Sequence, residues 1–326
     1  MVLKGFDIKR KWASIFIYLF VFATYGVAKD AMSLYVENDS RMIKPFHKTD
    51  RHYTHGTKFV YLTQPDWSWL DHFADWSAAE ADDEVDTAVG FFLGQNIYTP
   101  DHVDDPAKRS SDDMVFAGWL YTGMFAQRAT DHLLEHFELN IGVIGPSSEG
   151  EQVQKCIHEV LNSDDPIGWD DQLGDELAVD LTFMRKQRFQ NGMFQPTEKT
   201  DVIAEYGFTA GLVHRQAQAG VTFRYGFNLD NTFGPGRLSL PAGISALRAS
   251  DTKSGYLFAR AAAKAVEYNR FLTGLDTEPL VGEFQVGAVY QCKKLELGYS
   301  QTFFTREFGQ QSGKDSIGAV TVTYRF

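Results

Sequence analysis

The chain has 326 residues, a formal net charge of −12 at pH 7 and only two cysteines. An acidic chain lacks the basic footprint that nucleic-acid binding requires, and two cysteines provide no disulfide framework for an exported protein of this length. Length alone allows one large β domain or two ordinary domains.

The first residues have the pattern of a secretory signal peptide. Four basic residues at positions 4 to 11 precede an apolar run over 13–23, and the small residues Gly26 and Ala28 follow. A membrane anchor is the alternative, but the run is short for a span of about 20 residues. We therefore expect a signal peptide over 1–28, cleaved near Ala28, and a single domain over 29–326. Its removal takes away four basic residues and one acidic residue, which moves the charge from −12 to −15.

Strand-like runs recur along the rest of the chain, separated by polar or glycine-bearing turns. We place twelve of them, over 32–38, 54–63, 86–97, 114–127, 132–144, 175–188, 201–213, 216–227, 255–268, 281–291, 294–304 and 316–326. An even number of such lengths, with plentiful aromatic residues, favours an all-β, twelve-stranded antiparallel transmembrane β-barrel. In the last run, Val320, Val322, Tyr324 and Phe326 alternate with polar residues, as in the closing strand of outer-membrane barrels, although soluble sandwiches also end this way.

Strand parity predicts which connections share a rim. With both termini on the periplasmic side, the loops 38–53 and 99–113 and a short helix within 145–169 all open outward. Cys156 and Cys292 then lie on opposite sides and are not expected to pair. The long connections 64–85 and 228–254 fall on the periplasmic side, where turns are usually short, so they are plugs, periplasmic elaborations or a slip in the strand count.

Polar residues gather where the first two strands meet the outer rim. Asn38 and Asp39 end the first strand and point to opposite faces, and Thr54 begins the second strand beside them. Carboxylate, amide, hydroxyl and carbonyl oxygens suit Ca²⁺, so Asp39 and Thr54 are candidate metal ligands. An Asx-turn that closes the strand explains the same residues without a metal.

The outward helix carries a second group of candidates. Ser148 and Glu151 form an S-x-x-E capping pattern, which predicts a start near Glu149. An apolar stripe along the helix is expected to pack against the barrel rim. It consists of Val153, Cys156, Ile157, Val160 and Leu161.

Gln154 and His158 flank this stripe and, four residues apart, share one face. A near-neutral imidazole can take a proton from water, but an ordinary surface or partly buried histidine has the same pattern. No G-x-S-x-G motif or H-E-x-x-H zinc spacing is present in the sequence.

Five segments, in matching order, resemble the outer-membrane lipid A 3′-O-deacylase family. They are "END" at 37–39, "DRHYTHG" at 50–56, "QNIYTP" at 95–100, "FAGWLYTG" at 116–123 and "GVIGPSSEGEQVQKCIHEV…GWDDQL" at 142–173. The resemblance is clearest in the first half of the chain. It implies a twelve-stranded barrel of the bacterial outer membrane that removes the 3′-linked acyloxyacyl chain of lipid A in lipopolysaccharide, with calcium dependence.

Carried over by position, the resemblance implies a catalytic set with His158 as the base that activates water and calcium as the electrophile. Its other members are Asn38, Asp39, Thr54 and Gln154. An acidic substrate-site residue six beyond the histidine falls on Asp164, where a glutamate is expected. A lysine expected after "YTP", suited to a lipid A phosphate, has only Lys108 and Arg109 as nearby candidates, in a mostly acidic loop.

Three functions follow from these observations. The first is a calcium-assisted lipid A deacylase that acts as a monomer on lipopolysaccharide. The second is an outer-membrane phospholipase or other lipid esterase that uses water in place of a serine nucleophile. The third is a non-catalytic barrel, since a fold does not fix a function.

Overall fold

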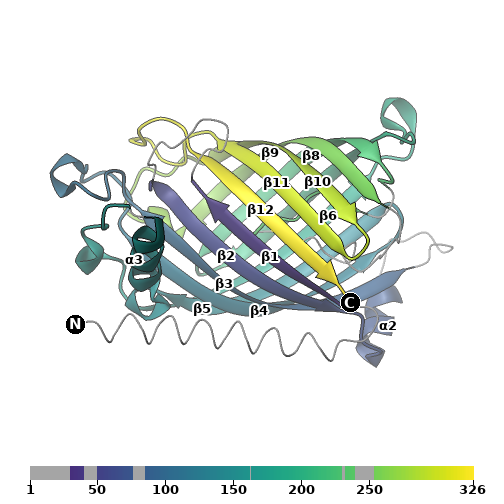
Figure 1. Cartoon of the computed structure of the whole chain (residues 1–326), viewed down its shortest axis with the longest axis horizontal. Helices are drawn as coiled ribbons and strands as arrows, with labels where there is room; N and C mark the ends of the chain where they lie inside the picture. Colours follow the sequence, from purple (N-terminus) through teal and green to yellow (C-terminus); the bar gives the residue numbers. More distant parts are fainter. Residues whose placement is uncertain (1–29, 40–49, 76–84, 162, 230–231, 239–252) are drawn as a thin grey trace.

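Twelve antiparallel strands form one closed barrel, in which each strand pairs with its neighbours along the chain and β1 pairs with β12 (Figure 1). The computed structural model describes residues 30–39, 50–75, 85–161, 163–229, 232–238 and 253–326. The predicted signal peptide, 1–28, lies outside them. The strands are β1 (Ala31–Asn38), β2 (His52–Thr63), β3 (Asp86–Thr99), β4 (Ala117–Ala129), β5 (Leu133–Ile144), β6 (Glu176–Arg188), β7 (Thr200–Gly211), β8 (His214–Phe227), β9 (Ser254–Asn269), β10 (Leu280–Cys292), β11 (Leu295–Phe304) and β12 (Ser316–Arg325).

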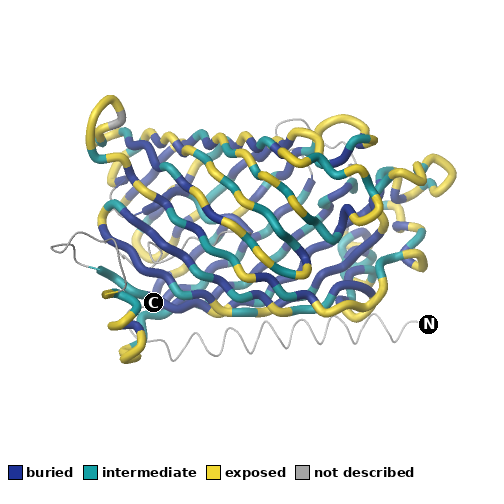
Figure 2. The backbone as a smooth tube through the Cα atoms, turned by 180° about the vertical axis from the view of Figure 1, so that it is seen from behind, coloured by how far each residue is buried: buried dark blue, intermediate teal, exposed yellow. Residues whose placement is uncertain are grey.

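The structure confirms the predicted barrel and its twelve strands. The two-residue alternation of the sequence appears in it as an alternation of buried and less buried residues. In β1 and β2, every second residue is buried. Figure 2 shows buried and exposed residues alternating along the wall. The barrel closes where Leu34 of β1 pairs with Val322 of β12, so the alternating last strand is indeed the closing strand.

The two ends of the barrel carry different elements. The helix α3 (Gly150–Leu161) lies at one end, here called the α3 rim, and α2 (Ser68–Asp75) lies with the C-terminus at the other, the α2 rim (Figure 1). Cys156 on α3 and Cys292 on β10 are both free, as predicted from their opposite rims. Among the described residues, no helix is long and apolar enough to cross a membrane. Short 3-10 helices occur at η2 (Pro106–Lys108), η3 (Pro146–Ser148), η4 (Trp169–Asp171), η5 (Gly192–Phe194) and η7 (Arg270–Leu272).

The barrel interior contains buried ion pairs alongside apolar side chains such as Phe92. Lys58 of β2 lies 3.2 Å from the Glu138 carboxylate of β5. Arg260 of β9 bridges Glu205 and Glu283, its Nη1 lying 2.7 Å from the latter. Buried charges require such partners. The Lys58–Glu138 and Arg260–Glu205 pairs connect strands that do not neighbour one another in the wall, whereas Glu283 lies on the adjacent strand β10.

The connection after β8 is a plug. Arg224 donates to the Leu229 carbonyl at 3.0 Å, and Lys186 donates to the Phe233 carbonyl at 3.2 Å. Further along, the Leu238 N–H donates to a Glu37 carboxylate oxygen at 3.0 Å. The described part of this connection therefore enters the barrel from the α2 rim and reaches Glu37, near the end of β1 at the α3 rim. The other long connection instead forms α2.

Loss of a plug anchor should weaken the fold. Arg224 is fully buried and its Nε lies 2.8 Å from Asp201, which Arg188 also contacts. We expect Arg224→Met to lower the free energy of unfolding by about 3 kcal/mol, the lower end for a broken buried pair, because Arg188 still faces Asp201. Urea unfolding in phospholipid vesicles measures the loss.

Arg215→Met is the matched control, since its ion pair with Glu267 at 3.0 Å is exposed and such pairs contribute about 0–1 kcal/mol. Equal losses in the two variants would show that the plug contacts do not stabilise the barrel.

Candidate functional site

The first part of the site is a β-bulge in β2. The pairing of β2 with β3 shifts between Tyr53 and His55, which leaves Thr54 as the extra residue. The Thr54 carbonyl accepts the Asp39 N–H at 3.2 Å and the Asn38 Nδ2 at 3.0 Å. Its hydroxyl lies 2.7 Å from that of Thr99. The predicted group of Asn38, Asp39 and Thr54 is thus in direct contact.

Asp39 lies in a concentration of negative charge. Burial raises the pKa of its carboxyl well above the ordinary value, and the nearby carboxylates of Asp50 and Asp315 add to this rise. The Arg51 N–H, 2.8 Å from Asp39 Oδ2, opposes it. A cation placed here would relieve the cost of keeping this buried carboxyl ionised.

The helix α3 approaches the wall closely because two glycines face each other. A Cβ on Gly150 would lie 2.8 Å from the Gly118 Cα of β4, so neither position has room for a side chain. The Gln95 side chain of β3 donates to the Ser148 carbonyl at 2.7 Å, just before the helix. The helix begins at Gly150, which confirms the predicted start near Glu149, but the Ser148 hydroxyl donates to the Gly145 carbonyl at 2.6 Å within its own 3-10 turn.

The face that α3 turns to the barrel is polar. Gln154 and His158 are only 2% and 5% exposed, whereas Val160 is 73% exposed. The prediction that the apolar stripe packs on the rim is therefore wrong for this part of the stripe, although Val153 packs against a buried cluster that includes Ile97. The contact between Gly150 of the helix and Gly118 of β4 sets the rotation of the helix. As a result, Gly150, Gln154 and His158 face the barrel wall.

Only the oxygen of the Gln154 side-chain amide has a hydrogen-bond partner among the described residues. Its Oε1 accepts the indole N–H of Trp169 at 2.8 Å. Its Nε2 is buried and has no hydrogen-bond partner within the part of the chain that the structure describes. A buried N–H donor without a partner is costly, so this atom is available to an acceptor that enters the site.

His158 lies between two oxygen atoms. Its Nδ1 is 2.5 Å from the backbone carbonyl of Asp164, and its Nε2 is 2.8 Å from Asp50 Oδ2. The Asp164 contribution seen here is its carbonyl, and its side chain is exposed. Asp50 was missed at the sequence level, although it is the first residue of the "DRHYTHG" segment. It connects the helix to the bulge, because its carboxylate also raises the pKa of Asp39 more than any other charge does.

The two candidate phosphate-binding residues lie in the β3–β4 loop. Lys108 is exposed and forms an ion pair with Asp105 at 2.8 Å. Arg109 donates to the carbonyls of Val103, at 2.7 Å, and of Ile167, beyond α3. Arg109 therefore fastens this loop to the segment that follows α3.

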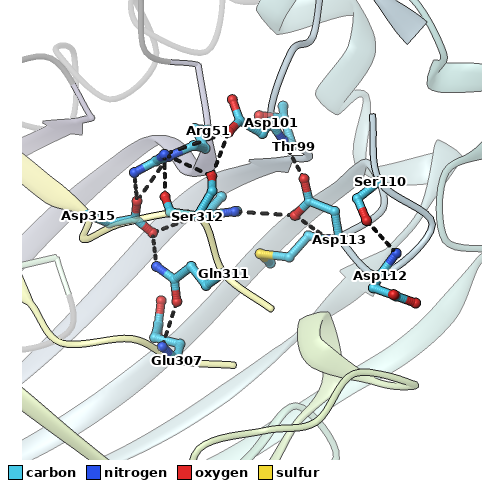
Figure 3. Close-up of polar contacts among 12 residues, drawn as sticks. Arg51, Thr99, Asp101, Ser110, Asp112, Asp113, Glu307, Gln311, Ser312 and Asp315 are labelled. Atoms are coloured by element: carbon cyan, nitrogen blue, oxygen red, sulfur yellow. Dashed lines mark hydrogen bonds and ion pairs between the residues drawn. The ribbon is translucent and has the colours of Figure 1, made fainter. Parts of the chain in front are cut away.

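A clasp of polar contacts joins three loops beside the site (Figure 3). Arg51 donates to Asp315 Oδ1 and to the Ser312 carbonyl, each at 2.7 Å. The His52 ring lies 2.6 Å from Asp315 and 3.2 Å from Asp113. The β1–β2, β3–β4 and β11–β12 loops are thus fixed together around the end of β2, an arrangement that local sequence patterns did not indicate.

The site is on the outside of the barrel wall. In β3, Asn96 and Tyr98 line an internal cavity of about 240 Å³, so the alternate residues Gln95, Ile97 and Thr99 face outward. The cavity is also lined by Asp39, at the top of β1, but by neither Gln154 nor His158. These two side chains lie in the contact between α3 and the outer face of the wall, where a lipid could reach them.

Metal binding here would depend on mixed oxygen donors. Among the described residues, no group of three or more His, Cys, Asp or Glu side chains is arranged to hold a metal ion. Calcium, however, accepts backbone and hydroxyl oxygens as well as carboxylates. The carboxylate of Asp39 and the oxygens of Thr54 supply such donors, and Asp50 adds negative charge nearby.

The clasp should keep the β11–β12 loop closed. Phe308 of that loop is buried against the His52 ring, with centroids 5.2 Å apart. Removing the guanidinium in Arg51→Gln deletes charge-assisted hydrogen bonds of about 1.5–3 kcal/mol each, so chymotrypsin should cleave at Phe308 about tenfold faster or more. Arg306→Gln, an exposed change in the same loop, should leave the rate unchanged. Equal rates in all three proteins would contradict the clasp.

Comparison with known proteins identifies relatives of this architecture. The family model described as "Outer membrane protein LpxR" matches residues 12–326. Among solved structures, LpxR from Salmonella typhimurium is 22% identical, with a TM-score of 0.72, covering 91% of this chain and all of that one. The β domain of the Bordetella autotransporter BrkA covers 91% of this chain and 99% of its own, at 11% identity and a TM-score of 0.45. No curated protein sequence matches the chain.

Proposed function

The chain belongs to the family of the outer membrane protein LpxR, and on this premise we propose that it is a calcium-dependent hydrolase of lipid A. The reaction is removal of the 3′-O-linked acyloxyacyl chain, which makes the enzyme a carboxylic ester hydrolase. Family and closed barrel locate the protein in the bacterial outer membrane. Its substrate, lipopolysaccharide, is a lipid of that membrane.

The observation that carries this proposal is the position of His158. The imidazole is buried between α3 and the outward face of the wall, with Nδ1 oriented by the Asp164 carbonyl at 2.5 Å. With Nδ1 as the donor in that hydrogen bond, Nε2 is the nitrogen that acts as the base once water replaces the Asp50 carboxylate beside it. A site outside the wall is reached directly by a lipid, whereas a site in the plugged interior is not.

The reaction requires one proton carrier. His158 Nε2 accepts a proton from water while the water oxygen attacks the ester carbonyl carbon. The Asp50 carboxylate, 2.8 Å from Nε2, stabilises the imidazolium that forms. When the bond between the acyl carbon and the 3′ oxygen of the sugar breaks, the same proton passes from His158 to that oxygen. The products are a free acyloxyacyl carboxylic acid and a 3′-hydroxyl group.

Two amides complete the site. Gln154 Nε2, buried without a partner among the described residues, is positioned to donate to the carbonyl oxygen or the water. Asn38 holds the bulge carbonyl of Thr54 and keeps the Asp39 backbone in place. Donors that are fixed before the reaction stabilise developing negative charge without reorganisation.

Asp39, with the oxygens of Thr54, would hold the calcium ion. When bound, calcium supplies positive charge that stabilises the oxyanion of the tetrahedral intermediate. The residues fit this role because the Asp39 carboxyl is buried among other carboxylates, where a divalent cation balances the charge. Lys108 remains the candidate for a lipid A phosphate, and Arg109 and Asp164 shape the site's edge through their backbone contacts.

A related lipid esterase, such as a phospholipase, is the second candidate function. It is favoured by the ion pair of Lys108 with Asp105, which leaves the β3–β4 loop with little free positive charge for a phosphorylated disaccharide. The same water-activating site would hydrolyse a glycerophospholipid ester. A non-catalytic barrel would instead turn over neither lipid.

Replacement of the base should remove the activity. We expect His158→Ala to lower lipid A hydrolysis by at least 10²-fold, as for loss of a general base. Mass spectrometry of lipid A after incubation with the refolded full chain, with calcium or a chelator, measures the loss of the 3′ acyloxyacyl mass. The chelator should abolish that loss in the unsubstituted protein.

His72→Ala is the matched control, because His72 lies on α2 at the opposite rim and is exposed. Full activity in His158→Ala would exclude the proposed base. Turnover of phospholipid without turnover of lipid A would select the second candidate, and turnover of neither by folded protein would select the non-catalytic barrel.

Calcium affinity should depend on Asp39. Removing one carboxylate charge in Asp39→Asn should weaken calcium binding by about tenfold or more, since ligand charge sets the affinity of oxygen sites. Isothermal titration of the detergent-refolded protein gives the dissociation constant without any lipid substrate. Asp112→Asn, an exposed carboxylate on the same rim, should bind like the unsubstituted chain. Unchanged affinity in Asp39→Asn would remove it from the ligand set.

A further inference from the structure

The helix α2 is docked on the outside of the barrel at the rim opposite the site (Figure 1). Its Phe73 ring contacts Phe137 of β5, with centroids 5.6 Å apart. In β5 the alternate residues His136 and Glu138 lie within the barrel, where Glu138 pairs with Lys58. Phe137 therefore faces outward, and α2 covers a patch of the surface that meets lipid in a membrane barrel.

An unbroken row of aromatic rings runs from α2 along this wall. Trp67 and Trp69 are 41% and 43% exposed, and their rings lie 6.0 Å apart. The next contact joins Trp69 to Phe73, at 6.4 Å. Across the strands, the row continues from Phe137 to Phe183 at 4.9 Å and on to Phe208 at 5.8 Å. Aromatic residues, and tryptophan above all, concentrate where a membrane meets water.

A cluster of charges lies on the same outward face. Arg128, Glu135 and Arg185 stand opposite one another on β4, β5 and β6. Arg128 Nε donates to Glu135 at 2.5 Å, and its Nη1 donates to the Phe73 carbonyl at the end of α2 at 3.2 Å. One guanidinium thus ties the helix end to the wall, where a cation also complements the helix dipole.

Arg185 has the looser ion pair of the cluster. Both guanidinium groups contact the carboxylate of Glu135, and the Arg185 contact to it is long, at 3.4 Å. The Arg185 Nε is buried and has no hydrogen-bond partner in the described part of the chain, although the side chain as a whole is 22% exposed. A guanidinium with an unused N–H beside lipid-facing aromatics is suited to a phosphate oxygen.

We propose that α2 and the Arg128–Arg185 pair form a binding site for a phospholipid of the periplasmic leaflet. In outer-membrane barrels the rim where the first strand begins and the last strand ends faces the periplasm, and α2 lies at this rim beside the C-terminus (Figure 1). The headgroup phosphate accepts from Arg185, and Trp67 and Trp69 lie at the headgroup level beside it. The site fixes the depth and tilt of the barrel from the leaflet opposite the hydrolase site, and it does not depend on the proposed reaction.

Binding of phosphatidylglycerol to the refolded full chain, followed by native mass spectrometry in detergent, tests the charged part of the site. Arg185→Gln should weaken this binding about tenfold, as for loss of a charge-assisted hydrogen bond. Arg185→Lys should recover part of the affinity. Arg215→Gln, which alters an exposed ion pair of β8, should bind as the unsubstituted chain does. Equal affinity in Arg185→Gln, or equal binding of phosphate-free diacylglycerol by the unsubstituted chain, would overturn the proposal.

Fluorescence quenching tests the aromatic part of the site. In vesicles of phosphatidylglycerol brominated near the headgroup end of its acyl chains, tryptophan emission of the unsubstituted chain should be quenched. Of the six tryptophans, Trp119 and Trp169 are buried within the protein, so the test uses a chain in which Trp12 and Trp76 are replaced by phenylalanine. In that chain the further change Trp67→Ala/Trp69→Ala should lose this quenching. The same quenched fraction in both proteins would show that these tryptophans do not contact lipid. A gel shift between heated and unheated samples verifies that each variant is folded.

Discussion

The candidate site depends on one local constraint, the bulge at Thr54. Beyond the last β1–β2 pair, Asn38 with His55, the Thr54 carbonyl accepts both the Asp39 N–H and the Asn38 amide, while the extra residue shifts the pairing of β2 with β3. Bulges commonly redirect side chains next to active sites, and here one turns a strand end into a rigid set of oxygen donors.

The constraint is supported from two directions. From inside, the plug reaches the Glu37 carboxylate, one residue before Asn38, through the Leu238 N–H. At the rim, Arg51 and His52 bind Asp315 and so hold the start of β2 to the β11–β12 loop. The bulge thus lies between a filled interior and a closed set of loops. This explains why a barrel that is usually a channel scaffold can carry a precise external site.

The strands and the loops at each rim could be predicted from the periodicity of the sequence. The contacts between residues far apart in the chain could not. Twelve strands, the loops of each rim and the contact of Asn38 with Thr54 followed from alternation and antiparallel pairing. The orientation of α3 did not, because the glycine contact between Gly118 and Gly150 overrides the apolar stripe. Asp50 also lay beyond local patterns, and the plug was one of three alternatives for 228–254, since their partners are distant in the chain and no periodic signal links them.

The geometry of His158 constrains how a base could operate here. Both ring nitrogens face oxygen atoms that only accept hydrogen bonds, the Asp164 carbonyl and the Asp50 carboxylate. In this arrangement the Asp50 carboxylate occupies the position beside Nε2 from which a water molecule would be activated. Base catalysis therefore requires Asp50 to give up this direct contact, with water entering between the two groups. The carboxylate then remains near enough to stabilise the imidazolium that the proposed reaction forms.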